Sequence, residues 1–188
     1  MIRDLETKRL HLRILDETYA RQVLTFYQNN RLFLEPWEPS RNDAFYTLEA
    51  QQTGLYLDQQ ATQNGQMLRF WLYTKSTDKS ISTLIGTVAI TNIIRGVFKS
   101  CYIGYKLDER YCGHGYMAEA LDAVVRFAFE EFNLHRIEAH IMPRNKKSIK
   151  VITRAGFGYE GLSKDYLKIN GKWENHYRYA KINQLLDL

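Results

Sequence analysis

Alternating and helical patterns of apolar residues divide the first third of the chain into distinct elements. Residues 9–14 alternate between apolar and polar side chains, which is the period of a half-buried strand. A helix is expected from about 16 to 28, because Asp16 can cap its first turn and apolar residues follow at helical spacing. A polar, glutamine-rich helix is expected over 45–63. Between the two helices, the prolines of segment 33–39 argue against regular helix and leave its aromatic side chains free for a ligand.

The remainder of the chain predicts more strands than helices. The strand patterns are rich in β-branched and aromatic residues, and the strongest helical pattern carries an apolar face. The expected elements are strands at 67–74, 82–93, 100–107 and 136–142, helices at 116–132 and 148–155, and a closing hairpin of 165–169 and 172–180 around Asn170-Gly171.

The order of these elements predicts a mixed α/β fold. Consecutive strands favour antiparallel pairing, while the later strand–helix–strand unit favours one parallel step. A chain of 188 residues is expected to form a single domain over residues 1–188 and can bury roughly 70% of its unfolded surface.

Composition and charge narrow the class of protein further. The 45% hydrophobic and 25% charged residues are typical of a soluble globular chain. No apolar run approaches the ~20 residues that cross a bilayer, and the first residues lack the apolar core of a signal peptide, so we expect a cytoplasmic protein without a membrane segment. Cys101 and Cys112 are expected to be free thiols, and their spacing predicts no metal site. The net charge of +5 suits an anionic ligand, and equally a well-solvated surface.

A glycine-rich turn lies between a strand and the strongest helix. Segment 110–115 has the pattern R-x-x-G-x-G. The first amides of a helix lack intrahelical partners and the helix dipole is positive there, so such a turn can bind phosphate. A tight strand-to-helix turn without a ligand explains the pattern equally well, and neither a P-loop nor a dinucleotide fingerprint fits. The candidate phosphate-binding residues are Arg110, Gly113, His114, Gly115 and Tyr116.

A second candidate site follows the next strand. Asn145 offers donor and acceptor groups, and Ser148 offers a hydroxyl three residues later. Both residues precede a short helix, so either can instead serve as its N-terminal cap.

Taken together, these residues resemble the GNAT acetyltransferase superfamily. R-x-x-G-x-G at 110–115 is similar to its pyrophosphate loop, and N-x-x-S at 145–148, eight residues ahead of Gly156-Phe157, is similar to its cofactor-arm site. Other stretches resemble one branch, the RimJ/RimL group of ribosomal-protein alanine N-acetyltransferases, and most closely the RimJ type. These stretches are 6–13, 33–39, 86–96, 101–105 and 165–173.

The resemblance implies a fold and a cosubstrate. It implies the GNAT fold: a twisted, mostly antiparallel sheet, flanked by helices and splayed at the central parallel strand pair, near 100–107 and 136–142. It also implies acetyl-CoA, with the thioester in the gap between these two strands. Cys112 and His114 depart from the longer polar or basic side chains common at these loop positions, so the phosphate contacts are expected to differ in detail.

The chemistry of acetyl transfer suggests which side chains move protons. A free α-amine titrates near 8, so roughly 10% of it is neutral at pH 7 and only a modest base is needed. The resemblance favours Asp165 as that base, with Glu138 on the splayed strand as the alternative; either can instead be an ordinary surface charge. Ser148 is the candidate acid for the departing thiolate, with helix capping as the rival role.

The remaining candidate residues surround the cofactor arm and the acceptor. The backbones of Tyr105, Lys106 and Leu107 are expected to hold the pantetheine arm, and an amide near Leu107 to stabilise the oxyanion. Phe33 and Trp37 can wall an open acceptor groove between their loop and the final hairpin, or simply pack in the core. The carboxylate of Glu38 can attract a cationic N-terminus.

The expected acceptor is the N-terminal α-amine of a ribosomal protein that begins with alanine or serine. Proximity to the ribosome, and a monomeric or homodimeric enzyme, belong to the same expectation. Two alternatives stay open at this point. One is a GNAT enzyme that acetylates a small amine such as a polyamine or an aminoglycoside. The other is a ribosome- or RNA-binding module without catalysis, suggested by the basic residues between 146 and 154.

Overall fold

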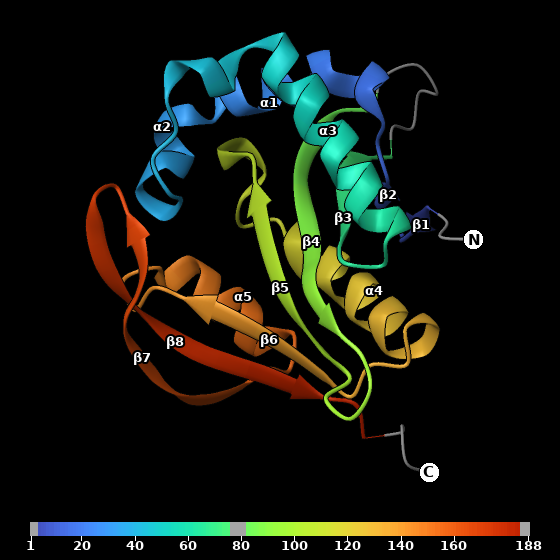
Figure 1. The fold of residues 1–188 in the computed structure, drawn as a ribbon, viewed down its shortest axis with the longest axis vertical. Coiled ribbons are helices and arrows are strands. Elements are labelled where there is room, and N and C mark those ends of the chain that lie inside the picture. The colour runs from blue at the N-terminus through green and yellow to red at the C-terminus, as the bar shows by residue number, and fades with distance from the viewer. Residues whose placement is uncertain (1–3, 76–81, 185–188) are drawn as a thin grey trace.

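An eight-stranded sheet forms the centre of the computed structural model, which describes residues 4–75 and 82–184 (Figure 1). The strand order is β1-β2-β3-β4-β5-β6-β8-β7. Within these described ranges, only β5 and β6 pair in parallel, and every other neighbouring pair is antiparallel. The predicted mixed α/β fold with one parallel strand pair is therefore confirmed.

The bounds of the elements follow the predicted order. The strands are β1 (Leu5–Glu6), β2 (Leu10–Arg13), β3 (Leu68–Thr74), β4 (Leu84–Ile94), β5 (Ser100–Leu107), β6 (Arg136–Ile141), β7 (Gly158–Ile169) and β8 (Lys172–Ile182). The helices are α1 (Ala20–Asn29), α2 (Arg31–Leu34), α3 (Leu48–Gln63), α4 (Tyr116–Glu131) and α5 (Lys146–Arg154), with 3-10 turns at Glu17–Tyr19, Glu35–Trp37, Asp43–Tyr46 and Glu109–Tyr111.

Two segments differ from the prediction for identifiable reasons. Segment 33–39 was expected to be irregular, but it continues α2 into the 3-10 turn Glu35–Trp37. Pro36 stands in the first turn of that 3-10 segment, where its missing N–H removes no internal hydrogen bond. Strand β7 begins well before the predicted position 165. Register shifts after Tyr159 and after Ser163 break the alternation that would have revealed it.

The sheet is covered on both faces. Helices α4 and α5 pack on one face, while α1 and α3 lie over the other face at the β2–β4 end (Figure 1). The alternation of β3 explains both cores, because Phe70 and Leu72 are buried in the cluster with α4, and Trp71 and Tyr73 in the cluster with α1 and α3. A strand that is buried on both faces carries a nearly continuous apolar run, as β3 does.

The sheet splays at its parallel pair. Pairing between β5 and β6 covers only Ser100–Tyr102 with Arg136–Glu138. Past that point β5 stays with β4 as far as Leu107, and β6 stays with β8 as far as Ile141. The two halves of the sheet therefore diverge where the resemblance predicted the gap.

Candidate active site

The hydrogen bonds at the two ends of β5 show which of its backbone groups point toward the gap. At the start, the amide of Arg136 in β6 donates to the carbonyl of Lys99 at 3.1 Å. At the end, the amide of Asp108 donates to Ile85 of β4 at 2.7 Å. Backbone groups of successive strand residues point to opposite neighbours. The backbone N–H and C=O groups of odd-numbered β5 residues therefore point toward β6, and those of even-numbered residues point toward β4.

This assignment separates the three residues predicted to hold the cofactor arm. Tyr105 and Leu107 turn their N–H and C=O groups toward the gap, beyond the end of the parallel pairing. Lys106 instead pairs its backbone with Thr87 of β4. A Cβ on Gly86 would lie 2.5 Å from the carbonyl oxygen of Lys106, so the two strands approach closely at that glycine. Tyr105 and Leu107 can thus pair with an extended ligand in the gap as a further strand would.

The glycine-rich turn leads directly into α4. Gly113 and Gly115 have φ values of 85° and 81°, in the left-handed region where a side chain is strained. Gly115 stands immediately before the helix and offers no capping side chain, so the amides of the first turn remain available for a ligand. A Cβ on Gly113 would meet no atom within 4 Å, so the turn is open on that side. These features fit a pyrophosphate group at the N-terminus of α4.

Two arginines lie near this turn and contact different partners. Arg110, predicted to contact phosphate, folds back onto Asp108 with its Nε at 3.0 Å and its Nη2 at 2.7 Å from the carboxylate. Arg9, immediately before β2, donates to the carbonyl of His114 at 2.9 Å and to Glu119 at 2.6 Å. The sequence indicates only that Arg9 is a polar residue in a strand pattern. Its contacts could not be predicted, because both partners lie more than 100 residues away.

Asn145 and Ser148 lie at the start of α5, which follows β6 on the other side of the gap from β5. The side chain of Asn145 accepts a hydrogen bond from the amide of Ser148 at 3.0 Å, so Asn145 caps the helix. The hydroxyl of Ser148 donates to the hydroxyl of Tyr105 at 2.8 Å, and Tyr105 donates to the carbonyl of Ser148 at 3.0 Å. Burial raises the pKa of Tyr105, so its phenol stays protonated. Ser148 therefore links α5 to β5 across the gap.

The two carboxylates predicted as bases lie in different surroundings. Glu138 is paired with Arg136, whose Nε lies 2.8 Å away. Asp165 lies exposed within the irregular part of β7, with a φ of 46°, and its amide donates to the Asn175 side chain at 2.8 Å.

A histidine and two tyrosines that the sequence analysis did not single out lie beside Glu138. The ring of His140 stacks on Tyr166 with a centroid distance of 4.5 Å, and meets the edge of Tyr102 at 5.0 Å. The alternation of β6 was the one available signal, since it puts Glu138 and His140 on the same face. Tyr166 reaches them from β7, which no local pattern could show.

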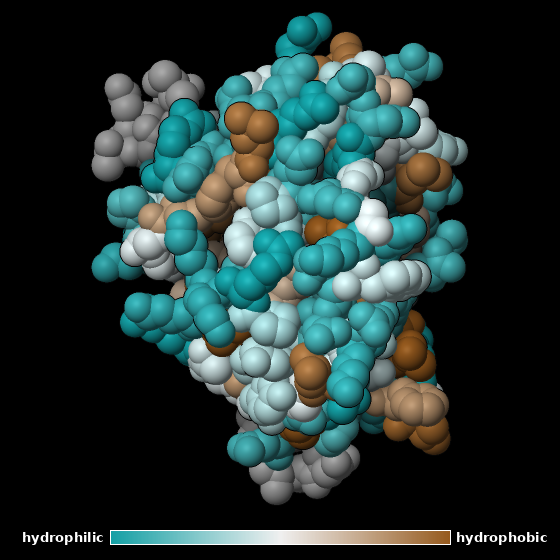
Figure 2. All heavy atoms as spheres, turned by 90° about the vertical axis from the view of Figure 1, so that its left-hand side faces the viewer, coloured by the Kyte–Doolittle hydropathy of each residue, from teal (hydrophilic) through white to brown (hydrophobic). Residues whose placement is uncertain are grey.

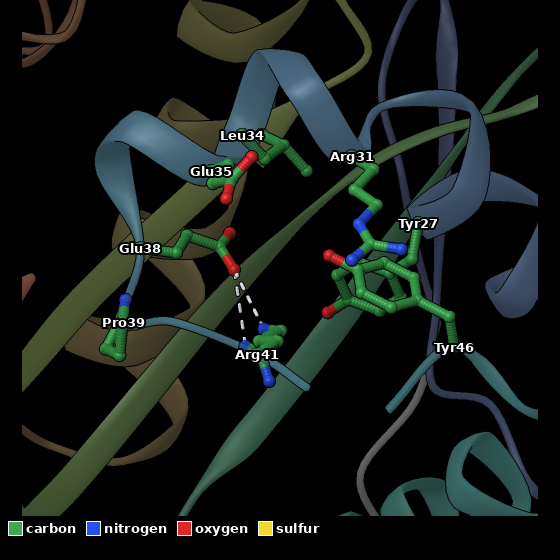
Figure 3. A pocket seen from close by; sticks show the side chains of 8 residues that line it. All are labelled: Tyr27, Arg31, Leu34, Glu35, Glu38, Pro39, Arg41 and Tyr46. Atoms are coloured by element: carbon green, nitrogen blue, oxygen red, sulfur yellow. Dashed lines mark hydrogen bonds and ion pairs between the residues drawn. The ribbon is translucent and has the colours of Figure 1, made fainter. Parts of the chain in front are cut away.

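Glu38, predicted to contact the acceptor, is held by two cations. It forms an ion pair with Lys106, and its Oε2 accepts from Arg41 at 3.2 and 3.3 Å. Figure 3 shows its carboxylate turned toward Arg41. Both side chains line a small hollow with a volume of about 20 Å³. The hollow is lined by Tyr27, Arg31, Leu34, Glu35, Glu38, Pro39, Arg41 and Tyr46.

Segment 33–39 and the β7–β8 hairpin are in contact. The Asn170 side chain, in the β7–β8 turn, donates to the carbonyl of Glu35 at 2.8 Å and accepts from Ser40 at 2.9 Å. Arg144 donates to the carbonyl of Pro36 at 2.8 Å. The two predicted sides of the acceptor groove are therefore bridged, so that the passage between them is closed at this edge.

The two aromatic residues predicted to wall the groove contact the start of α5. Arg144 lies over the ring of Trp37 at 4.9 Å, and Lys147 over the ring of Phe33 at 5.8 Å. Phe33 also packs against the core under α1 and α3. On the face of the molecule that carries α2 and this hairpin, Figure 2 shows a mostly hydrophilic surface with scattered hydrophobic residues.

The splayed strands, the open glycine turn and the capped α5 together match a known family. The model of the acetyltransferase (GNAT) domain matches residues 9–158. The chain belongs to the GNAT acetyltransferase family. Members of this family take the acetyl group from acetyl-CoA, so the predicted cosubstrate is confirmed.

Individual relatives cover nearly the whole chain. A probable N-acetyltransferase of Bacillus subtilis (strain 168), YjcK, is 40% identical over 95% of this chain and 97% of its own. The ribosomal protein uS5 alanine N-acetyltransferase of Escherichia coli (strain K12) is 36% identical over 92% of this chain and 87% of its own. The crystal structure of the ribosomal-protein-S5-alanine acetyltransferase of Vibrio fischeri superimposes with a TM-score of 0.89 at 36% identity, covering 98% of this chain and 99% of that chain.

The described part of the chain carries neither a membrane-spanning helix nor a cluster of metal-binding side chains. Among residues 4–75 and 82–184, no helix is both long and apolar enough to span a bilayer. In the same part of the chain, no three His, Cys, Asp or Glu residues are grouped so that they could hold a metal ion.

Proposed function

We propose that this acetyltransferase modifies the N-terminal α-amine of a protein, and that its acceptor is a ribosomal protein beginning with alanine or serine. The observation that carries the proposal is the 36% identity with the uS5 alanine N-acetyltransferase, over 92% of this chain. That match extends far beyond the cofactor-binding centre of the fold. It supports a shared acceptor as well as shared acetyl chemistry.

The charges on the acceptor side support a protein N-terminus over a polyamine or an aminoglycoside. A site for a small polycation needs carboxylates that are not already neutralised. Glu38 is paired with Lys106 and Arg41, and Glu138 with Arg136. A single α-amine carries one charge and titrates near 8, so it requires less neutralisation and only a weak base.

Acetyl-CoA, when bound, supplies the acetyl thioester. In this proposal the turn with Gly113 and Gly115 binds the pyrophosphate, and the backbones of Tyr105 and Leu107 hold the arm in extended form. Ser148 donates a proton to the departing sulfur, and the Tyr105 hydroxyl, which accepts the hydrogen bond of the Ser148 hydroxyl at 2.8 Å, orients the serine.

The test uses two versions of one basic peptide that begins with alanine. Purified enzyme and acetyl-CoA are incubated with the free peptide, with the same peptide blocked at its first nitrogen, and with spermidine. We expect a single acetyl group on the free peptide by intact mass, and none on the blocked peptide despite its lysines. Transfer to spermidine or to lysine side chains, with none to the α-amine, would refute the proposal.

A further inference from the structure

The first open position beyond the parallel pairing is occupied by a glycine and a histidine. The last pair is Tyr102 with Glu138, so the next residues on the same face are Gly104 on β5 and His140 on β6. A Cβ on Gly104 would meet no atom within 4 Å. There is therefore space over Gly104, directly across the widening gap from the His140 ring.

The His140 ring is held in one orientation by aromatic neighbours. It stacks on Tyr166 at an interplanar angle of 23°, and Tyr102 packs against it edge-on at 87°. Its Nδ1 lies 3.3 Å from the hydroxyl oxygen of Tyr166. When Nδ1 carries the proton and donates it to that oxygen, Nε2 keeps a lone pair. No partner for Nε2 is found in the part of the chain that the structure describes.

We propose that His140 takes the proton from the acceptor amine, an inference that rests on the proposed acetyl transfer to an α-amine. The ammonium group gives one proton to Nε2 of His140, and the neutral amine then forms the new C–N bond as the C–S bond breaks. The second amine proton leaves the nitrogen as the amide forms and replaces, through solvent, the proton that Ser148 has passed to the departing sulfur. The imidazolium afterwards releases its proton to water.

The charged groups around His140 favour its neutral form. Burial lowers the pKa of His140, the Glu138 carboxylate opposes this effect, and electrostatic interactions with His176 and Arg178 on β8 lower the pKa further. Tyr102 and Tyr166 are the remaining titratable groups packed against the ring, and burial raises the pKa of Tyr166. At neutral pH the imidazole is therefore unprotonated and able to accept a proton.

The two carboxylates considered from the sequence are less suited to this step. Glu138 is already paired with Arg136 at 2.8 Å. Asp165 is exposed to solvent, and its backbone amide donates the hydrogen bond to the Asn175 side chain. His140 combines a fixed ring with open space beside it, which neither carboxylate does.

The kinetic test compares His140→Gln with His135→Gln, a substitution immediately before the same strand, and with Asp165→Asn. We expect His140→Gln to lower kcat for the alanine peptide by about 10- to 100-fold near pH 7, with little change in KM. The deficit should shrink as the pH approaches the amine pKa, because more amine is neutral without help. His135→Gln should match the wild type. A kcat that is unchanged, or lowered equally at every pH, would overturn the inference.

A second readout needs no turnover. With CoA in place of acetyl-CoA, binding of the alanine peptide should lower the pKa of His140 seen by NMR, because a nearby ammonium disfavours the imidazolium. The blocked peptide should leave it unchanged. A pKa that responds equally to both peptides, or to neither, would overturn the inference.

The two proposals fail in different ways. If the wild-type enzyme acetylates another amine and no N-terminal peptide, the proposed acceptor is wrong, and the same variants test His140 on that amine. If the peptide is acetylated but Asp165→Asn alone loses activity at low pH, the acceptor stands and His140 is excluded. Gly104→Val gives a further check, since filling the space across from His140 should raise the KM of the peptide while acetyl-CoA affinity stays the same.

Discussion

Asn30 holds the carboxylate of Asp108 at 3.2 Å, 78 residues further along the chain. Its side-chain oxygen also accepts from the amide of Glu109 at 3.1 Å. Both side chains are buried, with 2% of Asn30 and of Asp108 exposed. The C-terminus of α1 is thereby fixed to the turn that leads into the glycine-rich loop, so the helix end and the phosphate site share one polar cluster.

Asn30→Ala should weaken both the fold and acetyl-CoA binding. The substitution removes a hydrogen bond from the buried Asp108 carboxylate and the partner of the Glu109 amide, which costs about 1–3 kcal/mol of unfolding free energy. The loosened loop should also bind acetyl-CoA less tightly. Thermal unfolding and calorimetry measure the two effects, with Asn29→Ala, an exposed neighbour on the same helix, as the control. Equal stability of the two variants would show that the cluster does not hold the loop.

Asp108 should make the stability depend on pH in the acid range. Burial alone would raise its pKa, but the hydrogen bonds from Arg110 and Asn30 outweigh it and hold the folded-state pKa below the ordinary value of an aspartate. A lowered carboxyl pKa contributes stability that is complete above the unfolded value and is lost as the pH falls through the folded one. The free energy of unfolding, measured with urea from about pH 5 to about pH 2, should therefore decrease less with falling pH in Asp108→Asn than in the wild type. Parallel curves would contradict this.

Gly113→Ala should reduce acetyl-CoA affinity by more than its effect on stability explains. Its φ of 85° strains any L side chain, at a cost of about 1–2 kcal/mol. Gly96→Ala is the matched control, because Gly96 also has a positive φ and open space around it but lies in the β4–β5 hairpin. We expect similar losses in melting temperature, and about a tenfold weaker acetyl-CoA complex only for Gly113→Ala. Equal affinities would remove this turn from the binding site.

Ser148 and Tyr105 can be separated by single substitutions. Ser148→Ala should lower kcat by up to about 10²-fold with little change in acetyl-CoA affinity, in line with the loss of one general acid. Tyr105→Phe removes the 2.8 Å partner of the serine and should give a smaller loss, since Ser148 keeps its own proton. Thr153→Ala, further along α5, is the control. If Ser148→Ala melts earlier yet keeps full turnover, the residue only supports the helix.

Local sequence patterns were sufficient for several parts of the molecule. The apolar face of α4 and the glycines before it were found because helix periodicity and left-handed turns depend on a few neighbouring residues. The same holds for Asn145 and Ser148, whose capping bond spans three residues. The predicted fold, the family and the acetyl donor all followed from such short motifs in the right order, and all three are confirmed.

Contacts between distant segments could only be decided by the tertiary structure. The bulges of β7 hid its first half, and with it the approach of Tyr166 to His140. The pairing of Glu38 with Lys106 joins two segments almost seventy positions apart in the printed sequence, and Arg9 reaches its loop over an even longer separation. A linear pattern reports which face of its own element a residue occupies. The side chains that meet on that face depend on strand order, register and the packing of helices against the sheet.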